Sequence, residues 1–132
     1  MDIEPVVTDR ARLPLDAHGY SRVTVVTADA AQPSPGLGKV DVLMVTVDAW
    51  DVPPTWIDQL KPDGRLVVPL RMRGLTRSIA FTRVGDHLES ESAKICGFVP
   101  MQGSTAHNEE LTLVNGTPEI RLLIPAGAGS GI

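Results

Sequence analysis

Two apolar runs, Val42–Val47 and Leu66–Leu70, dominate the hydrophobic pattern of the chain. Neither run alternates with polar residues, which is typical of strands covered on both faces, as in a parallel sheet with helices on each side. Asp51–Pro54 stops the first run, and Thr55–Leu60 predicts a short helix that begins after the prolines. Lys61–Gly64 predicts a turn before the second strand, because proline presets φ and glycine tolerates a positive φ. The pattern therefore predicts a strand–helix–strand crossover, which is right-handed almost without exception.

The segment before this crossover predicts one helix and one further strand. Apolar spacing predicts a helix from Val6 to Ala17, and Pro14 should end or kink it near Leu13 because proline removes a backbone donor. The β-branched run Val23–Thr27 predicts a strand. Met1–Ile3 resembles the end of another strand that runs straight into a proline.

The segment after the crossover changes to alternating apolar and polar positions, which is typical of antiparallel strands. Arg77–Arg83 and His87–Ile95 predict a hairpin that turns at Val84–Asp86. Leu111–Val114 and Glu119–Ile124 predict a last hairpin with an Asn-Gly turn. The fold class is therefore α/β, with a parallel sheet that gains antiparallel strands at its C-terminal side.

Composition narrows the class of protein. The 132 residues suffice for one modest domain, expected over residues 1–125, followed by a flexible Gly/Ala-rich tail over residues 126–132. The net charge of -4 and the isoelectric point of about 5.2 argue against nucleic-acid binding. No apolar run approaches the ~20 residues that a membrane span needs, and Met1–Arg10 does not resemble a signal peptide. The single Cys96 excludes an internal disulfide and suits a reducing compartment, so we expect a cytoplasmic protein.

Three acidic residues follow successive predicted strands: Asp2, Asp29 and Asp48. Ligands of open α/β sheets bind beyond the carboxyl ends of the strands, and a carboxylate can accept hydrogen bonds from both hydroxyls of a ribose. Aspartates also cap turns after strands without binding anything. The spacing alone leaves a nucleotide site and a capped sheet edge as equal alternatives.

The remaining polar and aromatic side chains give weaker evidence about function. The three histidines and Cys96 show no metal-ligand spacing, so no metal site is expected. Trp50 and Trp56 flank the prolines and either line a peptide-binding lip or pack against the sheet. Arg71 follows the last parallel strand, where it either meets a substrate carboxylate or belongs to a solvated loop.

Three blocks of sequence, residues 2–30, 40–70 and 85–103, resemble the protein-L-isoaspartate O-methyltransferases in the same order. The middle block, VDVLMVTVDAWDVPPTWIDQLKPDGRLVVPL, is the longest and the most specific. The chain resembles more closely the actinobacterial proteins of this type that are found beside peptide-modification systems. The resemblance implies a Rossmann-like methyltransferase that transfers a methyl group from S-adenosylmethionine to an isoaspartyl or aspartyl carboxylate of a protein or peptide.

The resemblance also assigns roles to individual residues. Asp2 takes the place of the acidic residue that holds the ribose hydroxyls, Ala28 lies beside the adenine ring, and Asp29 lies near the adenine amino group. Thr46 matches the threonine that precedes the family's small-residue pair near the active site. The resemblance therefore implies that Thr46 contacts the cofactor and, together with Asp48, belongs to the catalytic site. Asp48 departs from the small residues of the family at this point.

The family's glycine-rich cofactor loop and its upstream helix have no counterpart, since both would precede Asp2. We therefore expect a copy truncated at the N-terminus, whose sheet exposes the apolar strands Val23–Val26 and Val42–Val47. Such a chain should be marginally stable or associate with a partner through the exposed sheet edge. The rival function is a non-catalytic Rossmann-like fragment that binds a partner or is an inactive remnant.

Overall fold

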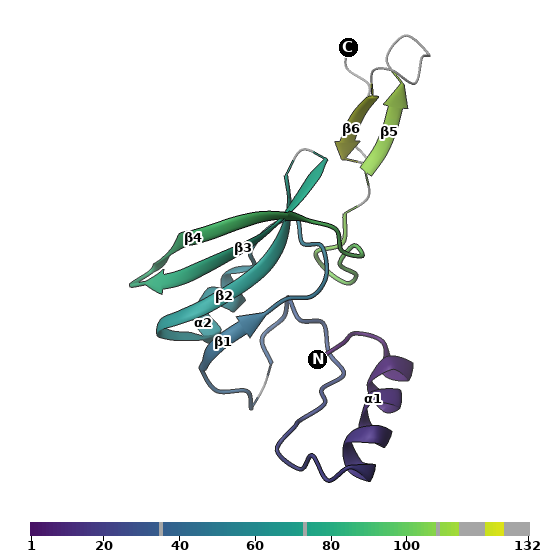
Figure 1. Ribbon diagram of the computed structural model, residues 1–132, viewed down its shortest axis with the longest axis vertical. Coiled ribbons are helices and arrows are strands. Elements are labelled where there is room, and N and C mark those ends of the chain that lie inside the picture. Colours follow the sequence, from purple (N-terminus) through teal and green to yellow (C-terminus); the bar gives the residue numbers. More distant parts are fainter. Residues whose placement is uncertain (35, 73, 108, 114–120, 126–132) are drawn as a thin grey trace.

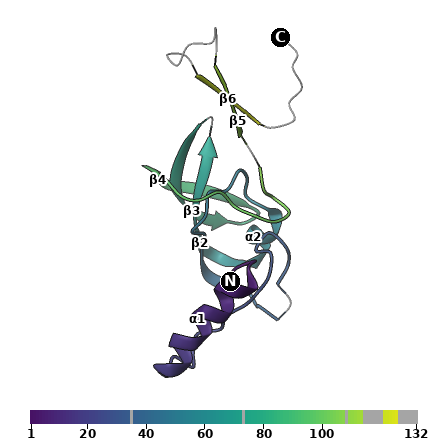
Figure 2. The ribbon, with the colours of Figure 1, turned by 90° about the vertical axis from the view of Figure 1, so that its right-hand side faces the viewer.

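A computed structural model describes residues 1–34, 36–72, 74–107, 109–113 and 121–125 (Figure 1). Its elements, in chain order, are α1 (Pro5–Ala17), β1 (Val40–Met44), α2 (Pro54–Gln59), β2 (Leu60–Met72), β3 (Leu75–Val84), β4 (His87–Cys96), β5 (Glu109–Leu113) and β6 (Arg121–Pro125). The first four strands form one sheet in the order β1-β2-β3-β4, and β5 pairs with β6 in a separate ribbon. Figure 2 shows the β5–β6 ribbon standing beyond one end of the main sheet.

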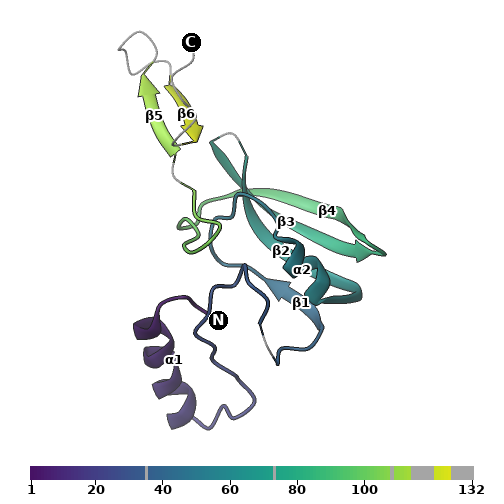
Figure 3. The ribbon, with the colours of Figure 1, turned by 180° about the vertical axis from the view of Figure 1, so that it is seen from behind.

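The predicted crossover is present. Strand β1 pairs in parallel with β2, and α2 lies between them in sequence, with Pro54 at its first turn. Figure 3 shows α2 lying against one face of the sheet beside β1 and β2. The helix buries Trp56 against this face, and the apolar runs supply its neighbours Leu66 and Val68. The partial Rossmann-like fold expected from the sequence is confirmed.

The predicted turn at Lys61–Gly64 occurs inside a strand rather than before one. Strand β2 begins at Leu60, and its register with β1 shifts between Val40 and Val42, so the intervening residues bulge out. Asp63 takes up the positive φ of 59°. A Cβ on Gly64 would lie 2.8 Å from the carbonyl oxygen of Lys61, which explains the glycine. Residues 61–64 thus form a turn as predicted, but the pairing of β1 with β2 continues on both sides of this turn.

Both predicted hairpins are present. Strand β3 pairs antiparallel with β2 and β4, and Gly85 opens the β3–β4 turn with a φ of 62°. Strands β5 and β6 are also antiparallel. The predicted Asn115-Gly116 turn and the predicted tail at residues 126–132 lie outside the described residues.

The structure differs from two local predictions, the strand at Val23–Thr27 and the end of the first helix near Leu13. Val23–Thr27 is no regular strand: its contact with Met1–Ile3 is one parallel bridge, between Asp2 and Thr27. The reason is that α1 begins at Pro5, so the partner segment is too short to form a ladder. Pro14 does not end α1, which continues to Ala17, because the lost hydrogen bond falls in the exposed last turns of the helix.

The hydrophobic core lies on the α2 side of the sheet. Trp56, Leu60, Leu66 and Val68 are almost completely buried, together with Met101 from the segment after β4. Helix α1 contributes little, since Thr8 is its one buried residue. In Figures 1 and 3 this helix stands away from the sheet.

Candidate functional site

A groove separates the N-terminal segment Met1–Glu4 from strand β1. Its cavity volume is about 490 Å³, and aliphatic side chains of β1 and the following residues line one wall. Val99–Gln102 closes one end. Within the described residues, the charged side chains that line the groove are the acidic Asp2 and Glu4. The groove therefore has an apolar wall and a negatively charged border.

Asp2 is held at this border by its main chain. Its N–H donates to the carbonyl of Val26 (3.1 Å), and its carbonyl accepts from the N–H of Ala28 (2.9 Å). Its side-chain Oδ1 accepts from the N–H of Glu4 (2.9 Å), and the residue is exposed. Asp2, Ala28 and Thr46, three of the five residues singled out from the sequence, line the same cavity. Hydroxyl groups of a ligand in the groove would meet the Asp2 carboxylate.

Asp29 does not line the groove but fastens a loop beside it. One carboxylate oxygen accepts from the N–H of Ser104 (2.8 Å) and the other from the N–H of Ala31 (2.9 Å). These two main-chain donors, that of Ser104 foremost, lower the pKa of Asp29 below its ordinary value. Gly103 has a φ of 95°, and a Cβ there would lie 2.6 Å from Asp29 Oδ2. The loop therefore approaches Asp29 as closely as only glycine allows.

Asp48 is buried, with 1% of its surface exposed. Its Oδ2 accepts from Thr76 Oγ1 (2.8 Å) and lies 3.3 Å from Arg71 Nη1 in an ion pair. Its Oδ1 has no hydrogen-bond partner in the described part of the chain. In this position the Asp48 carboxylate orients the side chains that it contacts, above all the guanidinium of the half-buried Arg71.

Hydrogen bonds connect the segment Val99–Ser104 to Asp48 and to Asp29. The sequence pattern assigned no role to this segment. Asp48 N–H donates to Val99 O (2.7 Å) and Met101 N–H donates to Asp48 O (2.8 Å), while Ser104 binds Asp29. The one available signal was Gly103 inside a polar loop. Contacts made over more than 50 residues of sequence leave no periodic pattern, so the segment's position had to come from the fold.

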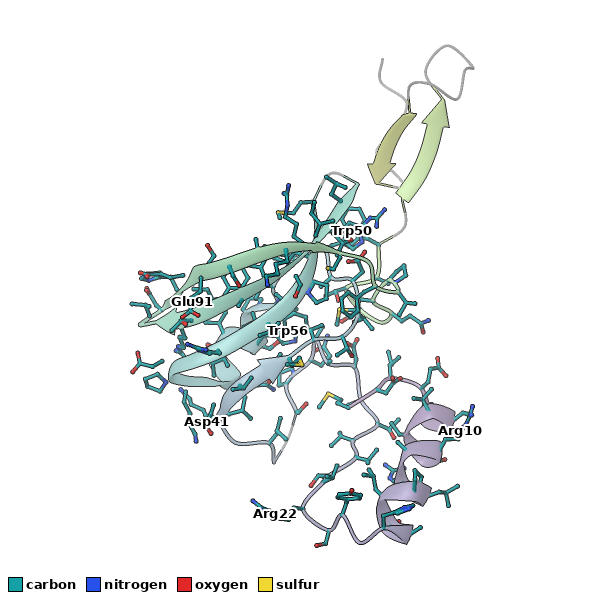
Figure 4. All side chains as sticks on the ribbon, in the orientation of Figure 1. Arg10, Arg22, Asp41, Trp50, Trp56 and Glu91 are labelled. Carbon is teal, nitrogen blue, oxygen red and sulfur yellow. The ribbon has the colours of Figure 1, made fainter. Side chains whose placement is uncertain are left out.

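The tryptophans lie in different surroundings, as Figure 4 shows for the labelled Trp50 and Trp56. Trp56 is packed in the core, and its Nε1–H donates to Ala30 O (2.7 Å), which confirms the packing alternative for this residue. Trp50 is half-buried, and its ring lies 5.4 Å from that of His107. Among the described residues no group of acidic, histidine or cysteine side chains is placed to hold a metal ion.

Comparison with known proteins identifies the family of this chain. The model of the family "Protein-L-isoaspartate(D-aspartate) O-methyltransferase (PCMT)" matches residues 2–106. The chain belongs to this family. The match covers the groove, the crossover, the β3–β4 hairpin and the Val99–Ser104 segment, so the whole candidate site lies inside the shared region.

Curated members of the family are about twice as long as the matched region. The protein-L-isoaspartate O-methyltransferase of Hyperthermus butylicus is 36% identical over 107 residues, which cover 80% of this chain and 44% of the relative. That of Roseiflexus sp. is 30% identical over 110 residues, or 83% of this chain and 50% of the relative. The chain thus spans about half the length of these relatives.

Solved structures agree on the fold. A protein-L-isoaspartate O-methyltransferase aligns with a TM-score of 0.73 and 25% identity over 78% of this chain and 33% of its own. The family's Plasmodium falciparum protein, solved with S-adenosyl-L-homocysteine, aligns with a TM-score of 0.67 and 14% identity over 76% of this chain and 50% of its own. The second likeness speaks for the fold alone.

No helix within the described residues is long and apolar enough to cross a membrane. The charged residues of the groove, Asp2 and Glu4, are exposed, and so are Glu89, Glu91 and Lys94 of the β3–β4 hairpin.

Proposed function

We propose that this chain carries part of a protein-L-isoaspartate O-methyltransferase, which transfers a methyl group from S-adenosylmethionine to an isoaspartyl or aspartyl carboxylate of a protein or peptide. The observation that carries the proposal is the family match over residues 2–106, which includes a groove lined by Asp2, Ala28 and Thr46. The location is proposed to be cytoplasmic, in keeping with the single Cys96.

The groove suits the adenosine part of this cofactor. S-adenosylmethionine offers two ribose hydroxyls and a positively charged sulfonium, and the charged groups of the groove's described lining are two carboxylates. Asp2 would accept hydrogen bonds from the ribose hydroxyls, and Ala28 would lie beside the adenine ring. Asp29, whose oxygens each already accept one main-chain hydrogen bond, would act at the amino group or fix the loop that borders it.

The bound cofactor supplies an electrophilic methyl group. A substrate carboxylate is already a nucleophile at neutral pH, so the protein must position it rather than deprotonate it. Thr46 is exposed at the end of β1 and lines the groove, where its hydroxyl would contact the reacting groups. Asp48 is buried and is proposed to act through Arg71, which would orient the substrate carboxylate. In this arrangement Thr46 is the catalytic residue and Asp48 a positioning residue.

Asp2→Asn tests the cofactor role. The substitution keeps the shape and one acceptor oxygen but removes the charge, and losing a charge-assisted hydrogen bond costs roughly 1.5–3 kcal/mol. Binding of S-adenosylhomocysteine, measured by titration calorimetry, should weaken about ten- to a hundredfold. Asp16→Asn, an exposed carboxylate on α1 away from the groove, is the matched control and should bind as the unchanged chain does.

Methylation of an isoaspartyl peptide, compared with the same peptide carrying ordinary aspartate, tests the substrate. A folded chain that binds no S-adenosylhomocysteine would favour the rival function, a non-catalytic fragment that binds a partner. Association through the exposed sheet edge is compatible with both the methyltransferase function and the rival, non-catalytic function.

A further inference from the structure

Trp50 lies outside the hydrophobic core, although its neighbours in sequence contact it. Ala49 is a core residue and Val52 packs against the core, whereas Trp50 does neither and is half-buried. Trp56, the other tryptophan of the chain, is 1% exposed. An indole is one of the largest apolar groups that a core can gain, and it is also common at binding surfaces. Trp50 is therefore a candidate for contact with a ligand.

The main chain that leads into Trp50 is fixed on both sides. Asp48 N–H donates to Val99 O (2.7 Å), and Ala49 N–H donates to Pro69 O (2.8 Å). Asp48 and Ala49 are each 1% exposed. Trp50 is thus the residue at which a buried, hydrogen-bonded segment reaches the surface. A ring on such a rigid base loses little conformational entropy when it binds a ligand.

Trp50 is also next to Arg71 in the register of the sheet. Arg71 N–H donates to Ala49 O (2.8 Å), the carbonyl of the peptide bond that leads into Trp50. The Arg71 side chain is 28% exposed, and its Nη1 is paired with Asp48 Oδ2 (3.3 Å). A guanidinium oriented by a buried carboxylate and a half-buried indole therefore come from adjacent positions at the carboxyl ends of the parallel strands.

His107 supports the indole from the far side of the sequence. Its ring lies 5.4 Å from that of Trp50, and the two planes are tilted by 47°. His107 is itself exposed. A tilted ring pair is a favourable contact that uses only part of the aromatic surface. The contact therefore steadies the Trp50 ring and leaves part of it for a further partner.

We propose that Trp50, supported by His107, determines which substrates the site accepts. The partner of this surface is an acidic peptide segment in which the carboxylate to be methylated has a bulky apolar or aromatic neighbour. Arg71 would contact the carboxylate, and the indole would pack against the neighbouring side chain. A basic peptide fits less well, because the guanidinium would repel it. This inference rests on the proposed function, since it names the class of substrate that the methyltransferase would take.

Peptide binding to the full chain, followed by NMR without cofactor, tests the proposal. The probes are Gly-Ser-Phe-isoAsp-Phe-Ser-Gly and the same peptide with alanine in place of both phenylalanines. The cross-peak of the Trp50 indole N–H should shift during the titration. That of Trp56, whose N–H is bonded to Ala30 O in the core, should stay in place. The phenylalanine peptide should bind about fivefold more tightly, as expected for an added aromatic pair.

Four variants separate recognition from packing. Trp50→Ala should reduce the ratio of the two affinities to about one, whereas Trp50→Phe keeps an aromatic surface and should retain most of the preference. His107→Ala, at an exposed position, should lower the ratio by about twofold. Tyr20→Ala is the control, because it removes a ring that is 61% exposed. Tyr20 is close in sequence to Arg22, which Figure 4 shows far from Trp50, so the ratio should not change.

The Trp56 cross-peak reports whether each variant keeps its core. The proposal is overturned if the unchanged chain binds both peptides equally or binds neither, or if Trp50→Ala weakens both by the same factor. Loss of the Trp56 cross-peak in both Trp50→Ala and His107→Ala would also overturn it, because the ring pair would then be part of the folded core.

The proposed function is tested separately, by calorimetry with S-adenosylhomocysteine. Trp50→Ala should leave this binding unchanged, because Trp50 is not among the described residues that line the groove. Cofactor binding without a peptide preference would refute the role of Trp50 alone. A peptide preference that depends on Trp50, without cofactor binding, would refute the methyltransferase function alone.

Discussion

The two edges of the main sheet differ in how they meet water. Strand β4 carries Glu89, Glu91 and Lys94 along its exposed length, so another strand that paired with it would have to desolvate charges. Strand β1 at the other edge is aliphatic apart from Asp41, which is engaged by Lys61 (2.9 Å). The charged β4 edge is suited to contact with water, whereas the aliphatic β1 edge is poorly suited to it. The two edges of the sheet therefore differ in the amount of apolar surface that they expose.

The largest expected effect comes from β2, the inner strand that pairs with β1 and β3. Leu66 of β2 is fully buried, so Leu66→Ala should lower the free energy of unfolding by roughly 2–5 kcal/mol through lost contacts and a cavity. Val42→Ala, on the exposed edge, should change it by less than about 0.5 kcal/mol. Urea unfolding measures both. Equal losses would mean that β1 is already covered in solution and would remove the contrast between the edges.

A smaller effect is expected from the link that holds the groove borders together. Trp56→Phe removes the indole N–H and part of a fully buried ring. The Ala30 carbonyl then has no buried donor, and this lost hydrogen bond alone costs roughly 1–3 kcal/mol. Trp50→Phe is the control, since its ring contact with His107 is half-exposed and contributes less than about 1.5 kcal/mol. The unfolding midpoint in urea distinguishes them. A larger loss for Trp50→Phe would show that the Trp56–Ala30 hydrogen bond does not hold the groove borders together.

The smallest effect concerns the charged edge. Hydrogen bonds to Glu89 and then Asp86 raise the pKa of His87 above its ordinary value of 6.5. A raised pKa in the folded state means that protonated His87 adds stability below the unfolded pKa, and this stability is lost as pH rises through the folded pKa. The side chain is exposed, so the change is slight. NMR titration of the His87 ring should report the raised pKa, and His87→Gln should flatten this part of the stability profile.

Much of the fold followed from local pattern. Unbroken apolar runs predicted β1 and β2, paired prolines placed the start of α2, and alternation around Gly85 predicted the β3–β4 hairpin. These features depend on side chains a few residues apart, so sequence spacing records them. The strand predicted at Val23–Thr27 failed for the opposite reason: a strand needs a partner, and the neighbouring Met1–Ile3 supplies a single bridge.

The sequence by itself determined the crossover, the hairpins, the acidic candidates and the family resemblance, because each is written in residues close together or in one contiguous block. Only the tertiary structure decided that Asp2, Ala28 and Thr46 share a groove, whereas Asp48 is buried in contact with Thr76 and Arg71. The position of a carboxylate depends on hydrogen bonds from distant segments, and no local period encodes them. For β1 the apolar run predicts a strand with two covered faces, and the family resemblance predicts that it is exposed. The sheet order shows that β2 is its one neighbour among the described residues.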